Sequence, residues 1–200
     1  TGAKRTCDDG ECGSCIVLLG NKGVMSCLLP VSRAQGKEVT TIEGLARLYS
    51  AGTTALADTP LETLHPLQYA FEELGATQCG FCIPGMIMQS KALLDARPNP
   101  TREEVTKWLA RNMCRCTGYV KIIDAVMYAA ELMRGVKKES KWSKGDGHVI
   151  GASVSRWDTP DKVRGLAKYA ADLKKEGMLY AKILRSPHHH ANILKIDTSQ

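Results

Sequence analysis

Two short runs of mostly apolar residues, separated by a polar turn, predict a β-hairpin near the start of the chain. Residues 15–19 (Cys-Ile-Val-Leu-Leu) and 23–28 (Gly-Val-Met-Ser-Cys-Leu) are rich in strand-favouring residues, and Gly20-Asn21-Lys22-Gly23 between them is typical of a hairpin turn. Residues 37–42 predict another strand, and residues 43–49 predict a short helix. We therefore expect a small β-rich unit closed by one short helix.

From residue 50 onward the apolar residues recur at the spacing of amphipathic helices. Residues 51–63, rich in Ala, Thr and Gly, predict a loop. The pattern then predicts four helices, over residues 65–74, 84–96, 101–112 and 119–133. Pro66 suits a first helical turn, Gly75 suits a C-terminal stop, and Thr101 with Glu104 forms a capping box. We expect these helices to form a small bundle.

The last third of the chain changes character again. Residues 135–150 are polar and rich in Lys, which is typical of a linker. Beyond them, residues 168–172 and 178–184 suggest the strand-containing start of another domain, too short here to close a core. Neither end carries a start or stop signal, so we expect the sequence to be part of a longer chain.

Eight cysteines fall into two sets of four, and none is left over. The first set is Cys7, Cys12, Cys15 and Cys27, and the second is Cys79, Cys82, Cys114 and Cys116. The first set begins with the spacing of plant-type ferredoxins, and four thiolates are what one [2Fe–2S] cluster needs. We therefore expect two [2Fe–2S] clusters, with one-electron transfer as their chemistry.

Zinc, disulfides and a redox-active dithiol are the alternatives. The pair Cys79 and Cys82 also suits a zinc knuckle or a thioredoxin-like dithiol. However, three thiols on one tight loop, Cys7, Cys12 and Cys15, have no use in a zinc ribbon built from two knuckles, and a dithiol would leave six cysteines unexplained. No secretory signal supports disulfides. The iron–sulfur interpretation is favoured, and structural zinc stays open.

Glycines and predicted helix starts fit the iron–sulfur interpretation. Gly10 and Gly13 lie between thiols of the first loop, where the backbone must curl around a cluster and glycine permits a positive φ. Cys82 directly precedes the second predicted helix and Cys116 precedes the fourth, so helix N-termini would face negative charge. Arg115 adds a cation, although a solvated surface arginine is an equal alternative.

Charge and hydropathy exclude several classes of function. The formal net charge is +6, and two oxidised clusters of about −2 each would bring it to about +2. The basic residues are scattered without aromatic interleaving or a recognised module, so we expect no nucleic-acid binding. No apolar run is long enough to span a bilayer and no signal peptide opens the chain, so we expect no membrane association and a cytoplasmic location.

Several motifs accompany the cysteines. They are Cys7-Asp-Asp-Gly-Glu-Cys12-Gly-Ser-Cys15, Thr41-Ile-Glu-Gly44, His65-Pro-Leu-Gln68, Gln78-Cys-Gly-Phe-Cys-Ile-Pro-Gly85 and Cys114-Arg-Cys-Thr-Gly-Tyr119, and later Arg156-Trp-Asp158, Lys162-Val-Arg-Gly165, Tyr169-Ala-Ala-Asp172 and Leu184-Arg-Ser-Pro-His-His-His-Ala191. Up to about residue 134 the chain resembles the iron–sulfur part of the molybdenum hydroxylases, the xanthine oxidase and aldehyde oxidoreductase family. From about residue 150 it resembles the start of their molybdenum-binding part. No flavin domain intervenes, as in the single-chain bacterial aldehyde oxidoreductases.

The resemblance implies an α+β fold built from three parts. Residues 1–49 would be a plant-type ferredoxin-like β-grasp domain with a [2Fe–2S] cluster, truncated at its N-terminus relative to the family. Residues 50–134 would be a four-helix [2Fe–2S] bundle, and residues 135–150 a linker. Residues 151–200 would begin an α/β molybdopterin-binding domain.

The resemblance also implies a function. The complete enzyme would hydroxylate an aldehyde or an N-heterocycle with water at a molybdenum–molybdopterin cofactor. Electrons would leave singly through the helical-domain cluster and then the ferredoxin-like cluster. Gln78 matches the position that hydrogen-bonds the pterin, with Cys114 beside it, and no catalytic residue is expected in this chain. The alternative is a stand-alone two-cluster electron carrier, against which residues 150–200 argue.

The implied partners follow from the same resemblance. They are an electron-acceptor protein or flavin subunit and the remainder of the molybdenum domain. A homodimer is also implied. The sequence identifies neither the substrate nor the acceptor.

Overall fold

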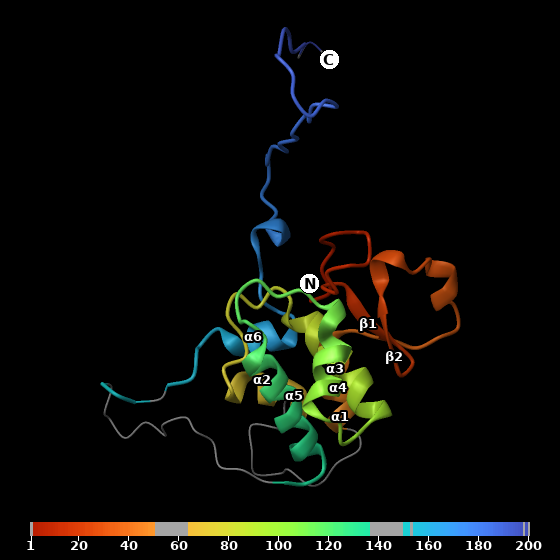
Figure 1. Cartoon of the computed structure of the whole chain (residues 1–200), viewed down its shortest axis with the longest axis vertical. Coiled ribbons are helices and arrows are strands. Elements are labelled where there is room, and N and C mark those ends of the chain that lie inside the picture. The colour runs from red at the N-terminus through yellow and green to blue at the C-terminus, as the bar shows by residue number, and fades with distance from the viewer. Residues whose placement is uncertain (1, 51–63, 137–149, 153, 198, 200) are drawn as a thin grey trace. The chain divides into compact units, whose positions relative to one another are not determined.

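The computed structural model describes residues 2–50, 64–136, 150–152, 154–197 and 199 (Figure 1). The chain divides into two compact units, Thr1–Lys168 and Tyr169–Gln200, and the cysteines all belong to the first. The predicted loop over 51–63 and most of the predicted linker over 135–150 lie outside the described residues. No helix within the described part is long and apolar enough to cross a bilayer.

A three-stranded antiparallel sheet in the order β2-β1-β3 carries the first cysteines. Strand β1 (Ile16–Leu19) pairs with β2 (Lys22–Met25) as the hairpin predicted, and with the two-residue β3 (Val39–Thr40). Leu19 is opposite Lys22, which leaves the two-residue loop that hairpins favour.

Two strand predictions were too long. The strand predicted over 23–28 ends at Met25, and a 3₁₀ turn, η1 (Ser26–Leu28), follows. The Ser26 hydroxyl donates to the carbonyl of Cys15, directly before β1, at 2.9 Å, and this bond turns the chain back toward the first loop. The strand predicted over 37–42 shortens to β3, since Thr41 is already the N-cap of the 3₁₀ turn η3 (Ile42–Gly44).

All four predicted bundle helices form, with changes at their ends. They are α2 (Pro66–Glu73), α3 (Ile83–Ala96), α4 (Arg102–Trp108) and α5 (Val120–Met133), and α1 (Leu45–Ser50) precedes them. The helix predicted over 101–112 ends at Trp108 and tightens into the 3₁₀ turn η5 (Leu109–Arg111). The Thr101–Glu104 capping box is confirmed. A second capping box, of His65 and Gln68, starts α2.

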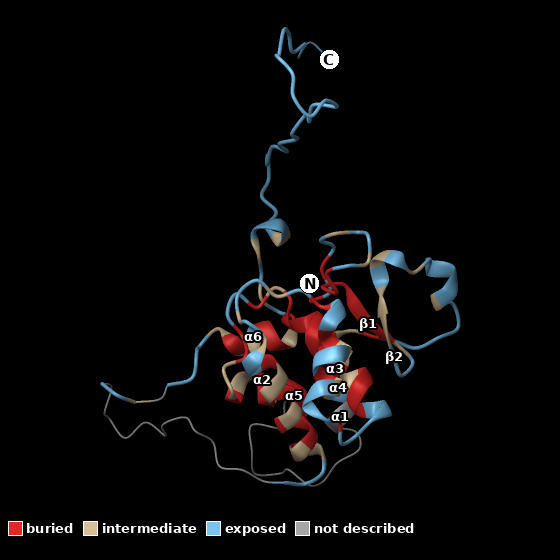
Figure 2. Cartoon of the chain, viewed as in Figure 1, coloured by how far each residue is buried: buried red, intermediate tan, exposed pale blue. Residues whose placement is uncertain are grey.

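One apolar core joins the sheet to the helices. Buried side chains of β1, including Ile16 and Leu18, belong to the same cluster as Phe71 of α2 and Ile83 and Ile87 of α3. Figure 2 shows buried residues along β1 and along α3, which pack against each other. Because the strands and helices share this core, the loops at their ends are held in fixed relation.

The segment after the linker contributes a helix that the sequence pattern did not reveal. Helix α6 (Thr159–Arg164) packs against α2, α3 and η3 within the first unit (Figure 1). The buried Gln68 amide donates to the Val163 carbonyl at 3.0 Å, and Val163 is fully buried. The first residues beyond position 150 are therefore packed onto the iron–sulfur part.

The strands suggested over 168–172 and 178–184 are wrong for the described residues. In the unit Tyr169–Gln200 the described residues form one 3₁₀ turn, η6 (Ala170–Asp172), and no strand. Leu179 and Ile183 there are 91% and 78% exposed. A single extended segment has no neighbour with which to form a ladder, and isolated strands are not stable.

Candidate functional site

The first four cysteines meet where the loop before β1 faces the turn after β2. Cys12 and Cys15 are buried, whereas Cys7 and Cys27 are half-buried. The Cys12 N–H donates to the Cys7 sulfur at 3.5 Å. The backbone N–H of Ser26 also donates to the Cys15 carbonyl, at 3.4 Å, which draws the 3₁₀ turn bearing Cys27 toward Cys15.

The thiol pKa values show how these four cysteines pair. Burial acts to raise the pKa of the Cys12 thiol, but hydrogen bonds from the Ser14 backbone and from Cys7 lower it overall. Burial raises the pKa of the Cys27 thiol, and the neighbouring Cys15 thiol raises it further. Cys12 therefore lies closest to Cys7, and Cys27 interacts first with Cys15 and more weakly with Cys7.

The first loop has the open backbone geometry and the space that a small inorganic cluster requires. Gly10 and Gly13 have φ of 80° and 69°, as their position between thiols predicted. The positive φ of Gly10 favours glycine there, and a Cβ would also lie 2.3 Å from Leu28 Cδ1. A cavity of about 410 Å³ is lined by Ala3, Lys4, Arg5, Asp8, Cys15, Ser26 and Cys27. Two thiols of the first set, Cys15 and Cys27, therefore line a hollow beside the loop.

The second four cysteines come from two loops brought together by α3 and α5. Cys82 is the N-cap of α3 and is buried, whereas Cys79 is exposed. The sulfur atoms of Cys116 and Cys79 lie 3.5 Å apart. Burial raises the pKa of the Cys82 thiol strongly, and the adjacent Cys114 thiol adds to this. The pairs here are Cys79 with Cys116 and Cys82 with Cys114.

Tyr119 and Thr117 hold the loop that carries Cys114. The Cys114 N–H donates to the Tyr119 hydroxyl at 2.8 Å, and that hydroxyl donates to the Asn112 carbonyl at 3.2 Å. Burial opposes ionisation of Cys114, but hydrogen bonds from Thr117 and from the Cys116 backbone keep the pKa of its thiol below the ordinary value. Tyr119 has a left-handed φ of 68°, so the chain bends sharply before α5 begins.

Both sets are built from pairs of thiols and not from one convergent group. Among the residues that the structure describes, no three His, Cys, Asp or Glu side chains gather closely enough to hold a single metal ion. The described cysteines are all free thiols. In a [2Fe–2S] cluster with four cysteines, each iron takes two thiolates, so two pairs are the arrangement that this cluster requires.

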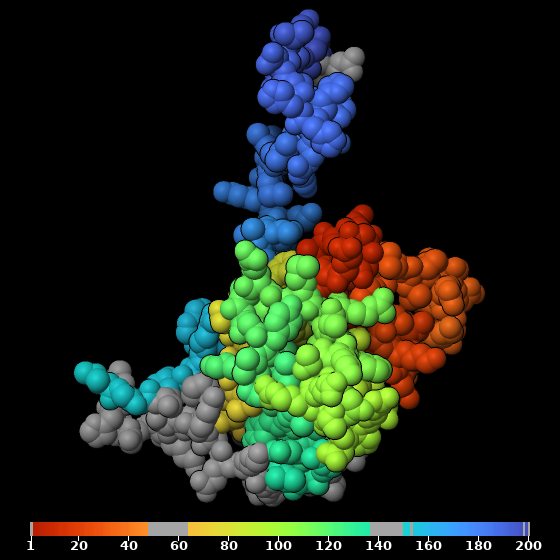
Figure 3. All heavy atoms as spheres, in the orientation of Figure 1, coloured from red at the N-terminus to blue at the C-terminus, as the bar shows by residue number. Residues whose placement is uncertain are grey.

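The two cysteine loops touch each other. The Met113 N–H, directly before Cys114, donates to the Cys12 carbonyl at 2.9 Å. The buried Asn112 amide donates to the Gly13 carbonyl at 3.3 Å. Figure 3 shows the start of the chain (red) lying against its middle (green). A short path of bonds therefore links Cys12 of the first set to Cys114 of the second.

Gln78 lies beside the second set. Its side chain is exposed, and its carbonyl accepts a hydrogen bond from Lys162 Nζ of α6 at 2.9 Å. The sequence reasoning named Gln78 but missed Lys162. The signal was available, because Lys162 opens a motif that the sequence analysis assigned only to the next domain. Asn112 and the hydroxyl of Tyr119 were also missed, and both stand next to or within the Cys114 motif.

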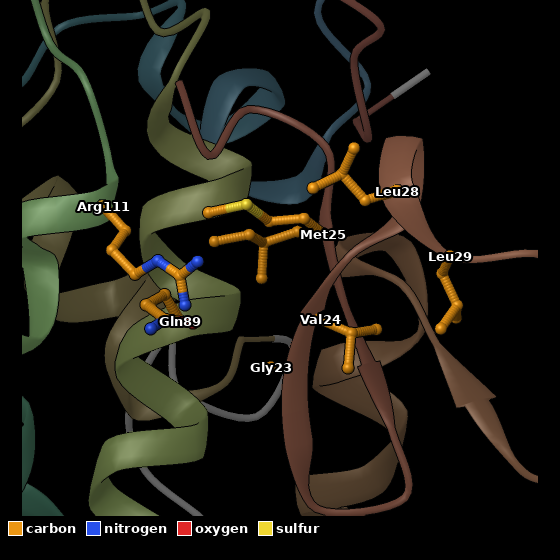
Figure 4. A pocket seen from close by; sticks show the side chains of 8 residues that line it. Gly23, Val24, Met25, Leu28, Leu29, Gln89 and Arg111 are labelled. Atoms are coloured by element: carbon orange, nitrogen blue, oxygen red, sulfur yellow. The ribbon is translucent and has the colours of Figure 1, made fainter. Parts of the chain in front are cut away.

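A separate groove lies between the hairpin and α3 (Figure 4). Met25 and Leu28 project into it from the hairpin side, opposite Gln89 and Arg111. Its volume is about 260 Å³, and its lining includes none of the eight cysteines. The groove is therefore distinct from both cysteine sets.

Comparison with known proteins identifies the relatives of this chain. Residues 41–127 match the family described as "[2Fe-2S] binding domain". The aldehyde oxidoreductase of Megalodesulfovibrio gigas is 40% identical over 209 aligned positions, which cover all of this chain and 22% of that protein. The small FeS subunit of Eubacterium barkeri nicotinate dehydrogenase is 44% identical over 131 positions, covering 66% of this chain and 75% of that subunit.

Solved structures agree with this relationship. The aldehyde oxidoreductase from Desulfovibrio gigas superposes with a TM-score of 0.72 at 42% identity, over 86% of this chain and 18% of that one. The described chain thus spans about a fifth of the aldehyde oxidoreductases that it matches. The predicted cofactors, [2Fe–2S] clusters with a molybdenum cofactor in the full enzyme, are confirmed for the family. The chain belongs to the xanthine dehydrogenase and aldehyde oxidoreductase family of molybdenum hydroxylases, whose iron–sulfur part it includes.

Proposed function

We propose that this chain is the electron-transfer portion of a molybdenum hydroxylase and binds two [2Fe–2S] clusters. One would be held by Cys7, Cys12, Cys15 and Cys27, and the other by Cys79, Cys82, Cys114 and Cys116. The observation that carries the proposal is the gathering of all eight free cysteines into two sets of two pairs. When bound, such clusters accept and release single electrons.

The pairing supports one assignment of thiolates to irons in each site. Cys7 and Cys12 would bind one iron of the first cluster, and Cys15 and Cys27 the other. In the second site the pairs would be Cys79 with Cys116 and Cys82 with Cys114. The hydrogen bonds that lower the pKa of Cys12 and Cys114 favour the thiolate, which is the form that binds metal.

The residues around each site support charge stabilisation. Because Cys82 caps α3, the first N–H groups of that helix lie next to the second site, and a helix N-terminus stabilises negative charge. Exposed Arg115 lies between two ligands and adds a cation. These groups offset part of the negative charge of a cluster bound by four thiolates.

The finer fold assignment is part of the proposal. Residues 1–49 would correspond to an incomplete ferredoxin-like domain, and residues 50–134 to a four-helix [2Fe–2S] domain. Residues 135–150 would be the linker, and residues 151–200 the beginning of the molybdenum-cofactor domain. The three-stranded sheet and the packed helices α2 to α5 support this division.

The order of electron flow follows from the position of Gln78. We place the Cys79–Cys116 site next to the molybdenum cofactor, with the exposed Gln78 side chain hydrogen-bonding the pterin and Cys114 beside it. The first site would then pass electrons to an acceptor protein or flavin subunit. The Met113–Cys12 hydrogen bond supports close coupling of the two sites.

Substrate and assembly are proposed from the relatives. Oxidation of an aldehyde or an N-heterocycle with water would take place in the remainder of the molybdenum domain, in a homodimeric enzyme. The runner-up is a stand-alone two-cluster carrier. The packing of α6 against α2 and α3 favours the leading proposal, because it holds the chain beyond residue 150 against the iron–sulfur part.

Metal analysis with spectroscopy tests the proposal. We expect about four irons and four sulfides per chain, a red-brown absorption, and two [2Fe–2S] signals in electron paramagnetic resonance of the reduced protein. Cys12→Ser should remove one signal and Cys82→Ser the other. Zinc without colour would establish the structural alternative. A single signal from a fully loaded protein would refute the two-cluster assignment.

A further inference from the structure

Three charged residues from the segment after residue 150 meet at the loop that carries Cys79. Lys162 Nζ lies 2.6 Å from Asp158 Oδ2. Arg156 binds the same carboxylate with two nitrogens, at 2.7 and 2.9 Å. Two cations and one anion leave a single net positive charge. We call Arg156, Asp158 and Lys162 the charge clamp.

The clamp is fixed to the backbone of the second cysteine site. Lys162 Nζ donates to the Gln78 carbonyl at 2.9 Å, and the same peptide unit supplies the N–H of Cys79. The methylene chain of Lys162 packs on Gly80, where an added Cβ would come within 2.6 Å of Lys162 Cγ. Gly80 also has a φ of 86°. Glycine is therefore needed at this position both for the positive φ and for the close approach of the Lys162 side chain.

Within the clamp, Lys162 is buried and Asp158 is partly covered, whereas the Arg156 side chain is 50% exposed. Lys162 is 9% exposed, so water screens its charge weakly. Hydrogen bonds from Arg156 and then from Lys162 hold the pKa of Asp158 well below its usual range, so all three groups are charged. Arg156 also lies close enough to Cys79 for its positive charge to interact with that sulfur. The net charge therefore acts at the exposed end of the site.

We propose that the charge clamp is a positioning device that sets the reduction potential of the cluster bound by Cys79, Cys82, Cys114 and Cys116. Reduction adds one negative charge to the cluster, and a nearby fixed positive charge stabilises that state. Lys162 also polarises the Gln78–Cys79 peptide and holds the loop in place. The clamp residues lie outside residues 41–127, which match the [2Fe–2S] binding family, so the following segment completes this site. This inference rests on the proposed function.

Charge variants in the complete protein that carries this chain test the clamp. Lys162→Met removes a cation and keeps the apolar stem, and Arg156→Gln removes the other cation. Each should lower the potential of the cluster whose signal is lost in Cys82→Ser. The equilibrium constant for moving an electron onto that cluster should fall about threefold to tenfold, which is about 30 to 59 mV. Asp158→Asn should shift it upward.

The direction of the shift in reduction potential distinguishes an electrostatic effect from structural damage, because the cation variants and the Asp158 variant should shift it in opposite directions. A merely structural clamp would give loss of iron or the same direction of shift for all three variants, and either result would overturn the inference. The matched control is Lys91→Met, which breaks a Lys–Asp pair on α3 that is covered to a similar degree, nine residues and about 13 Å along the helix from Cys82. It should leave the potential unchanged.

The readout is a redox titration followed by electron paramagnetic resonance, which reports both clusters in one sample. The signal lost in Cys12→Ser should keep its potential in every clamp variant. Normal signals with unshifted potentials would overturn the clamp alone. Absence of two [2Fe–2S] signals from the unsubstituted protein would overturn the proposed function instead.

Discussion

Gly85, in the first turn of α3, lies against the carbonyl of Gly13 in the first cysteine loop. A Cβ built on Gly85 would come within 2.2 Å of that carbonyl oxygen. Gly13 itself is equally confined, because its own Cβ would lie 2.5 Å from the Arg111 carbonyl. The first cysteine loop therefore approaches the first turn of α3, which follows Cys82, backbone to backbone, and glycine at both positions permits it.

Gly85→Ala should force α3 and the first cysteine loop apart. Overpacking of a tight backbone contact costs about 1–3 kcal/mol, so we expect the free energy of unfolding to fall by that amount. Electron exchange between the clusters should slow as well, since the Met113–Cys12 hydrogen bond lies in the same contact. Denaturant unfolding and the rate of intercluster exchange measure the two effects. Gly44→Ala is the control, because its nearest neighbour lies 3.8 Å away. Equal stability of the two variants would contradict the contact.

The order of electron flow is tested by removing one cluster at a time. In Cys12→Ser, substrate should still reduce the cluster of the second set, while turnover with a protein acceptor stops. The physical reason is that the second set lies beside Gln78, and the first set alone would face the acceptor. Rapid-freeze spectroscopy after substrate addition follows the remaining cluster. If that cluster stays oxidised in Cys12→Ser, the proposed order is incorrect.

Gln78→Ala in the complete enzyme should weaken retention of the molybdenum cofactor or slow electron exit from it. Loss of one hydrogen bond corresponds to about 1 kcal/mol, and more if a buried partner is left unpaired. The alanine keeps the backbone carbonyl that binds Lys162, so both clusters should remain. Cofactor content and the rate of cluster reduction are the measurements, and Gln89→Ala on α3 is the control. Wild-type values of both would show that Gln78 makes no pterin contact.

Because His65 is buried, we expect the free energy of unfolding to fall in mild acid. It is almost fully buried, its Nδ1 accepts from the Leu67 N–H at 3.1 Å, and burial lowers its pKa from 6.5 to about 3. Below pH 6.5 the unfolded chain therefore binds a proton that the folded chain does not, and stability falls as pH falls. Between pH 7.5 and 5.5 the loss should be about 1.4 kcal/mol.

Denaturant unfolding at a series of pH values measures this effect. The comparison is His65→Asn, which can still cap α2 but does not titrate in this range. Its stability should change less with pH than that of the wild type, by about the contribution of one histidine. Parallel pH profiles for the two proteins would exclude His65 as the titrating group.

The sequence by itself determined the local structure and the cofactor class. Proline and capping residues at Pro66 and Thr101 placed the helices, and the Gly20-Asn21 turn placed the hairpin, because these signals act over a few neighbouring residues. The ferredoxin-like spacing of Cys7, Cys12 and Cys15 depends only on chain geometry along one loop. For the same reason, the family could be recognised from motifs.

Only the tertiary structure decided which distant groups meet. The pairing of Cys79 with Cys116 and the contact of Met113 with Cys12 depend on a shared core, which no local pattern reports. The motif that Lys162 opens marks the residue but does not say what it contacts, since a lysine in an amphipathic segment is normally solvated. Its place beside Gln78, 84 residues earlier in the chain, follows from the packing of α6 on α2 and α3. This arrangement depends on burying apolar surface between distant segments. A local sequence pattern does not show which of the many possible segments will pack together.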